Sequence, residues 1–311
     1  MQLFHVIVNP ASKSGRGKEI WKGLEHVFEE EHTDFRVHFS ESTNHIHQVM
    51  KELQKEASTE APLYLIVFGG DGTLNQVIDS IEDFDAVKLG YIPSGSGNDF
   101  ARSRNLKGTP EDMLREILKG EVHHKLDIGV LTYPSGKRHF FDVSAGIGFD
   151  AAVCAEAGES KAKVVLNRLG LGKLTYVFIA LGQIISHKRP ACSLVLDDEK
   201  EVKLPHFLFV AAMLHAYEGG GFKFGPEADP EDGLLDLCVA GDVNKLLFLR
   251  ALPTAYEGKH YRFKGIDQYR AQKVVIKTAI PQWVHTDGET ELCVERVTIS
   301  CMKQRLQFLQ K

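Results

Sequence analysis

The sequence predicts an α/β domain with a mainly parallel sheet, followed by a β-rich, sandwich-like second domain. Up to about residue 128, apolar strand-like runs alternate with amphipathic helical segments, the pattern of a parallel sheet covered by helices. Beyond that point strand-like runs predominate. We therefore expect one domain from residues 1–128, joined by the tail 297–311, and a second domain from residues 129–296.

The first domain is predicted from four strands and the helices that follow them. Each strand is a short apolar run, and each helix carries apolar residues three and four positions apart. The strands are expected at 3–8, 35–39, 63–68 and 88–92. The helices are expected at 20–28, 46–53, 74–81 and from Pro110, where Thr109-Pro110 marks a start and Gly120 an end.

The second domain begins with a predicted hairpin, 127–133 and 139–144. Further strands are expected at 192–196, 207–213, 234–240 and within 273–300, with a short helix at 244–250. Residues 161–188 are predicted as one long interrupted helix in which apolar side chains are interleaved with Lys and Arg. Its default interpretation is a core helix with a solvated basic edge. The alternative is a surface that approaches anionic lipid headgroups.

Composition limits the classes of function. Hydrophobic residues make up 43% of the 311 and charged residues 25%, as in an ordinary globular protein. The net charge of −5 argues against a basic surface that binds nucleic acid. The five cysteines show no paired spacing, so neither disulfides nor a zinc site is expected and a reducing cytoplasm fits. The N-terminus is typical of a strand rather than a signal peptide, and the longest apolar region, 174–185, is too short to span a bilayer.

The stretch Gly69-Gly70-Asp71-Gly72-Thr73 stands between a predicted buried strand and a helix. Its glycines let the backbone turn sharply and approach a ligand, and the N–H groups of the helix start favour an anion such as phosphate. Asp71 would repel a phosphate unless a cation lies between them, so its presence indicates a Mg²⁺-nucleotide. The alternative is a plain strand-to-helix turn with an acidic N-cap.

Three further loops follow strands of the same domain. Asn9-Pro10 leads into residues 11–18, which are rich in glycine, hydroxyls and cations, although a flexible surface turn is an equal alternative. Ser42 or Thr43 would cap the helix after the second strand. Residues 93–102 form another glycine-rich turn. Because ligands bind at the carboxyl ends of parallel strands, we expect all four loops to gather at one site.

These motifs resemble those of the catalytic-domain family of diacylglycerol kinases, which also contains sphingosine and ceramide kinases. Pro93-Ser94-Gly95-Ser96-Gly97-Asn98-Asp99-Phe100-Ala101-Arg102 matches the family's Pro-x-Gly-Thr-x-Asn-Asp-Phe-Ala-Arg, with Ser96 where threonine is usual. NAD kinases share the Gly-Gly-Asp-Gly-Thr stretch but lack the Asn-Asp-Phe-Ala element. The resemblance covers nearly the whole chain and looks closest to the soluble bacterial diacylglycerol kinase-like proteins. Residues 146–150 match another family element, whose chemistry the resemblance leaves open.

The resemblance implies an enzyme that transfers the γ-phosphoryl group of ATP to a lipid hydroxyl, with diacylglycerol as the expected acceptor and phosphatidic acid as the product. The active site would lie in the cleft between the two domains, and Asp71 would organise the Mg²⁺ of the nucleotide. The implied nucleotide-binding residues are Asn9, Pro10, Ala11, Ser12, Lys13, Thr43, Gly69, Gly70, Asp71, Gly72, Thr73, Leu74, Asn75 and Ser96.

The resemblance also implies catalytic carboxylates. It places one on Asp287-Gly288-Glu289, so Glu289 is the candidate base that accepts the proton of the lipid hydroxyl. Asp99 would help to position the acceptor or the metal. In sphingosine kinases the aspartate equivalent to Asp71 has the base role, so Asp71 is the alternative to Glu289. Without the resemblance, Asp-Gly at this place is simply a hairpin turn.

A structural Mg²⁺ site is a further implication. The resemblance assigns it to Asp229, Asp232 and the carbonyl of Leu234, which together offer hard oxygen ligands. The alternative is an acidic turn before a strand, because Asp232-Gly233 is a standard turn pair.

The expected partner is a membrane lipid related to diacylglycerol, which a cytoplasmic protein would reach by peripheral contact with the inner membrane surface. The glycine-rich loop 219–225 is a candidate lining of the lipid entrance. No nucleic acid partner is expected, and resemblance to bacterial relatives implies a homodimer. Two rival functions remain: a kinase for another lipid, such as a sphingoid base or phosphatidylglycerol, and a non-enzymatic, nucleotide-binding regulator.

Overall fold

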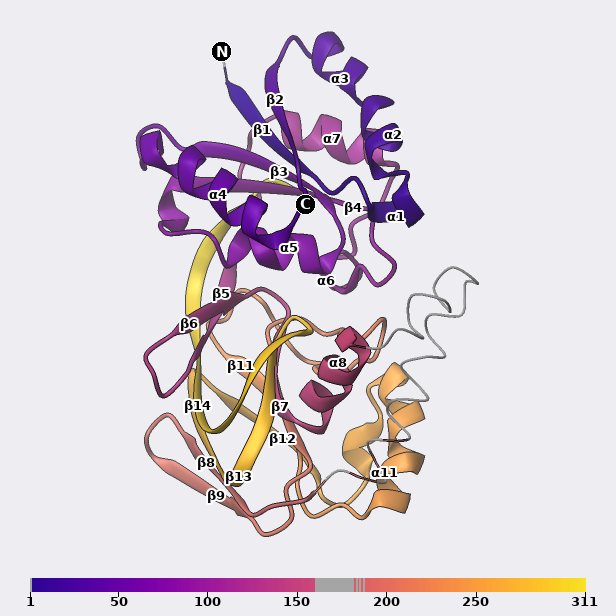
Figure 1. The fold of residues 1–311 in the computed structure, drawn as a ribbon, viewed down its shortest axis with the longest axis vertical. Helices are drawn as coiled ribbons and strands as arrows, with labels where there is room; N and C mark the ends of the chain where they lie inside the picture. Colours follow the sequence, from indigo (N-terminus) through magenta and orange to yellow (C-terminus); the bar gives the residue numbers. More distant parts are fainter. Residues whose placement is uncertain (1, 160–181, 183, 185, 187) are drawn as a thin grey trace. The chain divides into compact units, whose positions relative to one another are not determined.

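A computed structural model describes residues 2–159, 182, 184, 186 and 188–311 of the chain (Figure 1). The chain forms two compact units, Met1–Ile128 with Lys303–Lys311, and Gly129–Met302. The tail that joins the first unit therefore begins at Lys303, and the predicted start at 297 is wrong. Residues 297–300 belong to the second unit because they still pair with a strand of that unit, at 273–276.

The first unit contains a parallel sheet whose strand order is β4-β3-β1-β2. The strands are β1 (Leu3–Val8), β2 (Asp34–Phe39), β3 (Leu63–Gly69) and β4 (Val87–Pro93). The far end of β14 (Glu289–Phe308) adds a further parallel pairing to β4, at Gln307 and Phe308. The predicted α/β class and parallel sheet are thus confirmed, and all the carboxyl ends of β1 to β4 lie at one edge.

Helices follow each of these strands. They are α1 (Ser12–Gly15), α2 (Gly17–Lys22), α3 (Glu25–Glu30), α4 (Thr43–Leu53), α5 (Asp71–Ile78), α6 (Asp99–Ser103) and α7 (Pro110–Leu118), with 3₁₀ turns at Gln54–Glu56 and Phe84–Ala86. The single helix predicted at 20–28 is in fact two helices. The break falls at Gly23 and Leu24, where glycine favours interruption.

One face of this sheet is covered by α2, α3 and α7 (Figure 1). Alternate strand residues such as Phe4, Phe68 and Ile92 face these helices, and Trp21 packs edge-on against Phe28 and Phe68. Helix α5 contacts β3, and α4 lies beside α5. The expected cap of α7 is present as a capping box between Thr109 and Asp112.

The second unit is built mainly from antiparallel strands. In order they are β5 (His124–Thr132, in this unit from Gly129), β6 (Arg138–Phe141), β7 (Ser144–Gly148), β8 (Cys192–Leu196), β9 (Lys200–Leu204), β10 (Phe209–Met213), β11 (Leu235–Ala240), β12 (Ile266–Ala271), β13 (Lys273–Thr286) and β14 up to Met302. Strands β12, β11, β10, β7 and β13 are consecutive neighbours, while β8 pairs with the first part of β13. The expected β5–β6 hairpin is confirmed.

Both faces of these strands are buried. On β10, Val210 and Ala212 face one cluster, whereas Phe209 and Met213 face another that includes Phe248. This period of two is the signature of a strand between two apolar layers. The second cluster is covered by α8 (Phe149–Glu159), α11 (Lys245–Ala251) and the 3₁₀ turns Leu252–Glu257 and His260–Arg262. The predicted β-rich, sandwich-like second domain is therefore confirmed.

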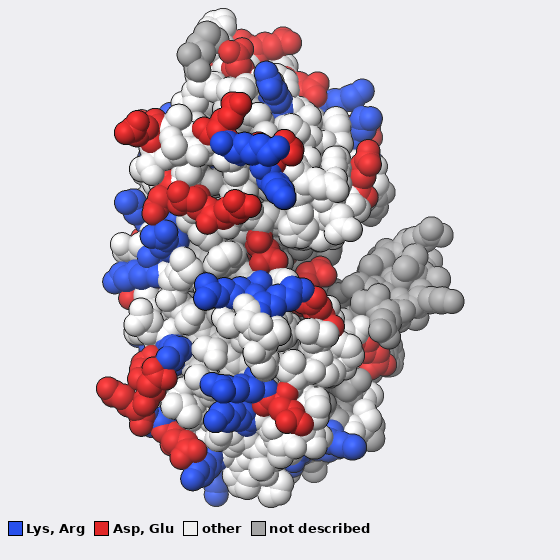
Figure 2. Space-filling view, turned by 60° about the vertical axis from the view of Figure 1, so that its left-hand side comes forward, with Lys and Arg blue, Asp and Glu red and all other residues white. Residues whose placement is uncertain are grey.

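Charged side chains of both signs are interspersed on the face shown in Figure 2, over the residues drawn there in colour. Arg115 binds three carboxylates, those of Glu30, Glu31 and Glu111. Among the described residues, no helix combines the length and the apolar character that crossing a bilayer would need. The long helix predicted at 161–188 lies almost wholly outside the described residues.

Candidate functional site

The turn between β3 and α5 holds the central glycine-rich motif. Gly70 is the N-cap of α5, and Asp71 is the first residue of the helix. The carbonyl of Gly70 accepts the N–H groups of Thr73 and Leu74, at 3.0 and 3.1 Å. The amides of Asp71 and Gly72 precede these bonds, as the first amides of a helix do, and so suit an anion at the helix start.

Two glycine-rich turns touch backbone to backbone in the first unit. A Cβ added to Gly95 would lie 2.6 Å from the Cα of Gly70, so neither position tolerates a side chain without movement. The N–H of Ser94 donates to the carbonyl of Gly69 at 2.7 Å. Asn98, in the left-handed region at φ 53°, closes the second turn by accepting the N–H of Gly95 at 2.9 Å. The turns after β3 and β4 thus form one surface.

The loop after β1 joins the same surface. The side-chain amide of Asn9 donates to the Thr73 hydroxyl at 2.9 Å, and its Oδ1 accepts the N–H of Ala11 at 2.9 Å. The N–H of Lys13 donates to the Ser94 carbonyl at 3.3 Å. A Cβ on Gly17 would come within 2.3 Å of the Asn9 carbonyl, so this glycine permits the tight loop. The structure therefore brings three of the four predicted loops into direct contact.

The remaining nucleotide candidates differ in what they can offer. Thr43 is the exposed first residue of α4, beyond the carboxyl end of β2, and Ser42 rather than Thr43 is the N-cap. Ser96 is exposed on the turn after β4. Leu74 is fully buried, so only its backbone could contact a ligand, and Asn75 is 4% exposed. Pro10 and Ser12 are partly buried in the loop after β1.

Asp71 and Asp99 form a carboxylate pair beside this surface. A Cβ on Gly97 would lie 3.0 Å from Oδ2 of Asp71 and 3.7 Å from Oδ2 of Asp99, so both carboxylates face the same glycine. Asp71 accepts the N–H of Phe100 at 3.3 Å, and Asp99 binds Arg102 at 2.9 Å. Burial and then the charge of Asp99 raise the pKa of Asp71 above its ordinary value. Two close carboxylate groups of this kind suit a divalent cation, which would relieve their repulsion.

Glu289 stands next to a tight hairpin turn in the second unit. Asp287 and Gly288 connect β13 to β14 with positive φ values of 48° and 85°, the conformation of a two-residue hairpin turn. The Asp287 carboxylate accepts the N–H groups of Asp142, Val143 and Ser144 at 2.7 to 3.0 Å. Asp287 therefore anchors the turn, and Glu289 is exposed as the first residue of β14.

The turn proposed as a structural Mg²⁺ site has protein partners of its own. Oδ1 of Asp229 accepts the N–H of Glu231 at 3.1 Å, and Oδ1 of Asp232 accepts the N–H of Leu234 at 2.8 Å. The other oxygen of Asp232 binds the guanidinium of Arg270. A cation at Asp232 would share this carboxylate with the guanidinium, and the metal site stays a prediction.

Comparison with known proteins identifies the family. Residues 4–131 match the diacylglycerol kinase catalytic domain, and residues 143–310 match the YegS C-terminal NAD kinase beta sandwich-like domain. A diacylglycerol kinase from Mycobacterium tuberculosis is 30% identical over 247 residues, 79% of this chain and 76% of that protein. The chain belongs to the diacylglycerol kinase family. It is accordingly a lipid kinase, an enzyme of the transferase class.

Solved structures agree with this fold. A diacylglycerol kinase from Bacillus anthracis has a TM-score of 0.70 at 17% identity and is covered to 97%, with the whole of this chain aligned. An NAD kinase from Archaeoglobus fulgidus in complex with ATP has a TM-score of 0.53 at 13% identity, covering 99% of this chain and 94% of that one. At these identities the likeness supports the fold alone.

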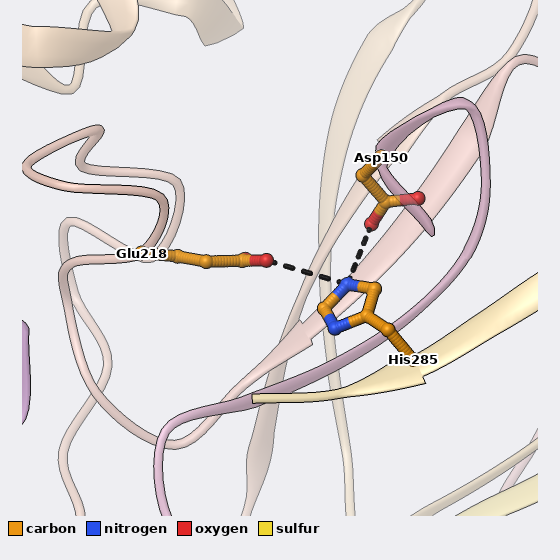
Figure 3. Close-up of side chains that lie close together, drawn as sticks. All are labelled: Asp150, Glu218 and His285. Carbon is orange, nitrogen blue, oxygen red and sulfur yellow. Dashed lines mark hydrogen bonds and ion pairs between the residues drawn. The ribbon is translucent and has the colours of Figure 1, made fainter. Parts of the chain in front are cut away.

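This lipid kinase also contains a cluster that the sequence did not reveal. Asp150 at the start of α8, Glu218 after β10 and His285 near the end of β13 point toward one another (Figure 3). Burial lowers the pKa of His285, but the hydrogen bond to Asp150 and the charges of Glu218, Asp150 and Asp287 raise it to about 9. Residues 146–150 had matched a family element and could have drawn attention to Asp150. Glu218 carried no signal, because it lies far before His285 in the chain and no spacing links the two residues.

Proposed function

We propose that this lipid kinase transfers the γ-phosphoryl group of ATP to the hydroxyl of diacylglycerol. The observation that carries the proposal is the contact among three glycine-rich turns at the carboxyl edge of the parallel sheet, with Asp71 and Asp99 beside them. The name of the M. tuberculosis relative supports the lipid, and the ATP complex of the A. fulgidus NAD kinase supports the nucleotide.

The phosphates of ATP would lie over the turns after β1, β3 and β4. Backbone N–H groups of these turns and of the α5 start would donate to phosphate oxygens, with Lys13 as a candidate cation. Asp71 and Asp99 would hold Mg²⁺, which when bound would neutralise charge on the phosphates. Because glycines line these turns, the nucleotide can approach the backbone closely.

Glu289 is the proposed general base. Its exposed carboxylate lies beyond a turn whose backbone is anchored by Asp287, so it is available to a substrate while its main chain is held. A lipid hydroxyl that attacks the γ-phosphorus must lose its proton, and a carboxylate within reach can accept it. Asp71 remains the alternative base.

The test is a panel of lipids incubated with labelled ATP and Mg²⁺. We expect phosphorylation of diacylglycerol and not of sphingoid bases or phosphatidylglycerol. If only another lipid is phosphorylated, that lipid and not diacylglycerol is the acceptor. The absence of any lipid product, together with intact ATP binding, would favour a non-enzymatic regulator.

The variant Glu289→Gln separates binding from chemistry. We expect turnover to fall at least about 100-fold with ATP affinity unchanged, because the amide is isosteric but accepts no proton. Glu295→Gln, exposed further along β14, is the matched control and should retain full turnover. Unchanged turnover in Glu289→Gln would transfer the base role to Asp71.

A membrane-held acceptor requires the enzyme to reach a lipid surface. We propose peripheral contact, which flotation with vesicles containing diacylglycerol and anionic lipid would detect. Homodimer formation likewise stays a prediction, and sedimentation of the purified chain would measure it.

A further inference from the structure

The cluster of Asp150, Glu218 and His285 takes no direct part in the proposed phosphoryl transfer. Nε2 of His285 lies 3.3 Å from Oδ2 of Asp150 and 3.3 Å from Oε1 of Glu218 (Figure 3). The exposed fractions of the three side chains are 0% for His285, 11% for Asp150 and 13% for Glu218. Two carboxylates so poorly solvated need a positive or hydrogen-bonding partner, and Nε2 of His285 is placed between them.

Gly146 makes room for this arrangement. A Cβ at this position would come within 2.1 Å of Asp150 Oδ2 and 2.4 Å of His285 Nε2. The pairing of β7 with β13 sets Gly146 directly opposite His285. The glycine of the family element at 146–150 therefore allows the histidine and the aspartate to meet.

The second nitrogen of His285 links the cluster to the hairpin turn. The N–H of Gly288 donates to Nδ1 at 3.2 Å. The carboxylates raise the pKa of His285 and favour a second ring proton, but a proton on Nδ1 would meet the Gly288 N–H, so in this geometry the ring proton lies on Nε2 and faces the two carboxylates. A metal ion on Nε2 would instead require the proton on Nδ1, against the Gly288 N–H, so the observed contacts favour a hydrogen-bonded cluster over a metal site.

The turn before Glu289 is therefore held at two points. Asp287 is held by the N–H groups at the start of β7, and Gly288 is held by His285. Within the part of the chain that the structure describes, a Cβ added to Gly288 would meet no atom within 4 Å. The hydrogen bonds to Asp287 and Gly288 fix the direction in which the chain enters β14 at Glu289.

We propose that His285, held by Asp150 and Glu218, is a positioning residue that fixes the Asp287-Gly288 turn and through it the Glu289 carboxylate. This inference rests on the proposed function, in which Glu289 accepts the proton of the lipid hydroxyl. A base that is displaced by an ångström loses much of its effect although the substrate still binds.

Two substitutions separate the two nitrogens of the ring. His285→Asn keeps an acceptor near Nδ1 for Gly288, whereas His285→Gln keeps a donor near Nε2 for the carboxylates. We expect His285→Gln to lower kcat about 10-fold and His285→Asn to lower it less, with the KM for ATP unchanged in both. His206→Gln is the matched control, because His206 is exposed and pairs with Asp242.

Amide hydrogen exchange at residues 287–289 supplies a readout that does not depend on activity. It should be faster in His285→Gln than in wild type or His285→Asn, because only the Gln variant loses the acceptor for Gly288. If His285→Asn does not fold, His285→Asn and His285→Gln are compared in a protein that also carries Glu218→Gln. That substitution removes one of the two buried carboxylate charges that face the ring. A purely structural role would instead make the Asn variant the more damaged of the two.

The outcomes distinguish this inference from the proposed function. If wild type has no lipid kinase activity, the proposed function is wrong. The hydrogen-exchange data would still test whether His285 holds the Asp287-Gly288 turn. The positioning role alone would be overturned if wild type is active, Glu289→Gln is inactive and His285→Gln keeps full kcat. One equivalent of Mn²⁺ or Zn²⁺ bound by wild type but not by His285→Gln would also overturn it, in favour of a metal site.

Discussion

At the scale of the residue, the candidate site contains a carboxylate, Asp71, whose charged form is destabilised by burial and by the neighbouring Asp99. Asp71 faces Asp99 across Gly97 and is largely removed from water, which explains the upward shift in its pKa. A folded-state pKa above the unfolded value means that the charge of Asp71 opposes folding once the pH rises through that range. The charge of Asp71 thus lowers the stability of the fold, and the Mg²⁺ proposed for this site would offset that cost.

Asp71→Asn should change both the stability of the protein and its turnover. At neutral pH we expect a higher melting temperature, because the unfavourable charge is gone, and turnover lower by at least about 100-fold. Thermal unfolding and lipid phosphorylation measure the two effects. The control is Asp34→Asn at an exposed position on β2, which should change neither. A fall in the melting temperature of Asp71→Asn would show that its charge stabilises the fold.

At the scale of the element, the glycine-rich turns form a site only because their backbones meet. The turn after β3 and the turn after β4 are neighbours because β3 and β4 pair in parallel from Leu63–Val87 to Gly69–Pro93. Gly70 and Gly95 then face each other at the ends of the two strands, with no space for a Cβ. Strand register therefore decides which glycines are indispensable.

Gly95→Ala should separate these turns. We expect a loss of about 1–3 kcal/mol in the free energy of unfolding, because the new methyl group overlaps backbone atoms of Gly70, and weaker ATP binding by about 10-fold. Denaturant titration and calorimetry measure the two quantities. Gly182→Ala, at an exposed helical position with nothing within 4 Å of the Cβ, is the control. Normal ATP binding in Gly95→Ala would mean that the contact of the turns does not shape the nucleotide site.

At the scale of the whole molecule, the two units share strand β14. Its first part pairs with β13 in the second unit, and its end pairs with β4 in the first. Phe308 is fully buried and packs edge-on against Phe100, the residue after Asp99. The last residues of the chain thus support the element that carries a proposed catalytic carboxylate.

Phe308→Ala should therefore destabilise the first unit. We expect a loss of about 3–5 kcal/mol in its free energy of unfolding, the usual cost of truncating a buried phenylalanine. Denaturant unfolding monitored by exchange in residues 1–128 and in residues 129–302 would locate the effect. Leu292→Ala, at an exposed position on the same strand, should cost far less. Equal loss in both variants would contradict the structural role of the tail.

The sequence by itself determined the alternation of strands and helices, the turn at Asp287-Gly288 and the glycine-rich strand-to-helix turn at residues 69–73, since each depends on local spacing and backbone preference. It also indicated the change of domain near 128. Only the tertiary structure decided that residues 297–302 belong to the second unit, that Arg270 pairs with Asp232, and that Glu218 meets Asp150 and His285. These contacts join residues far apart in the chain. Local sequence patterns do not determine which distant side chain will bind a given polar group.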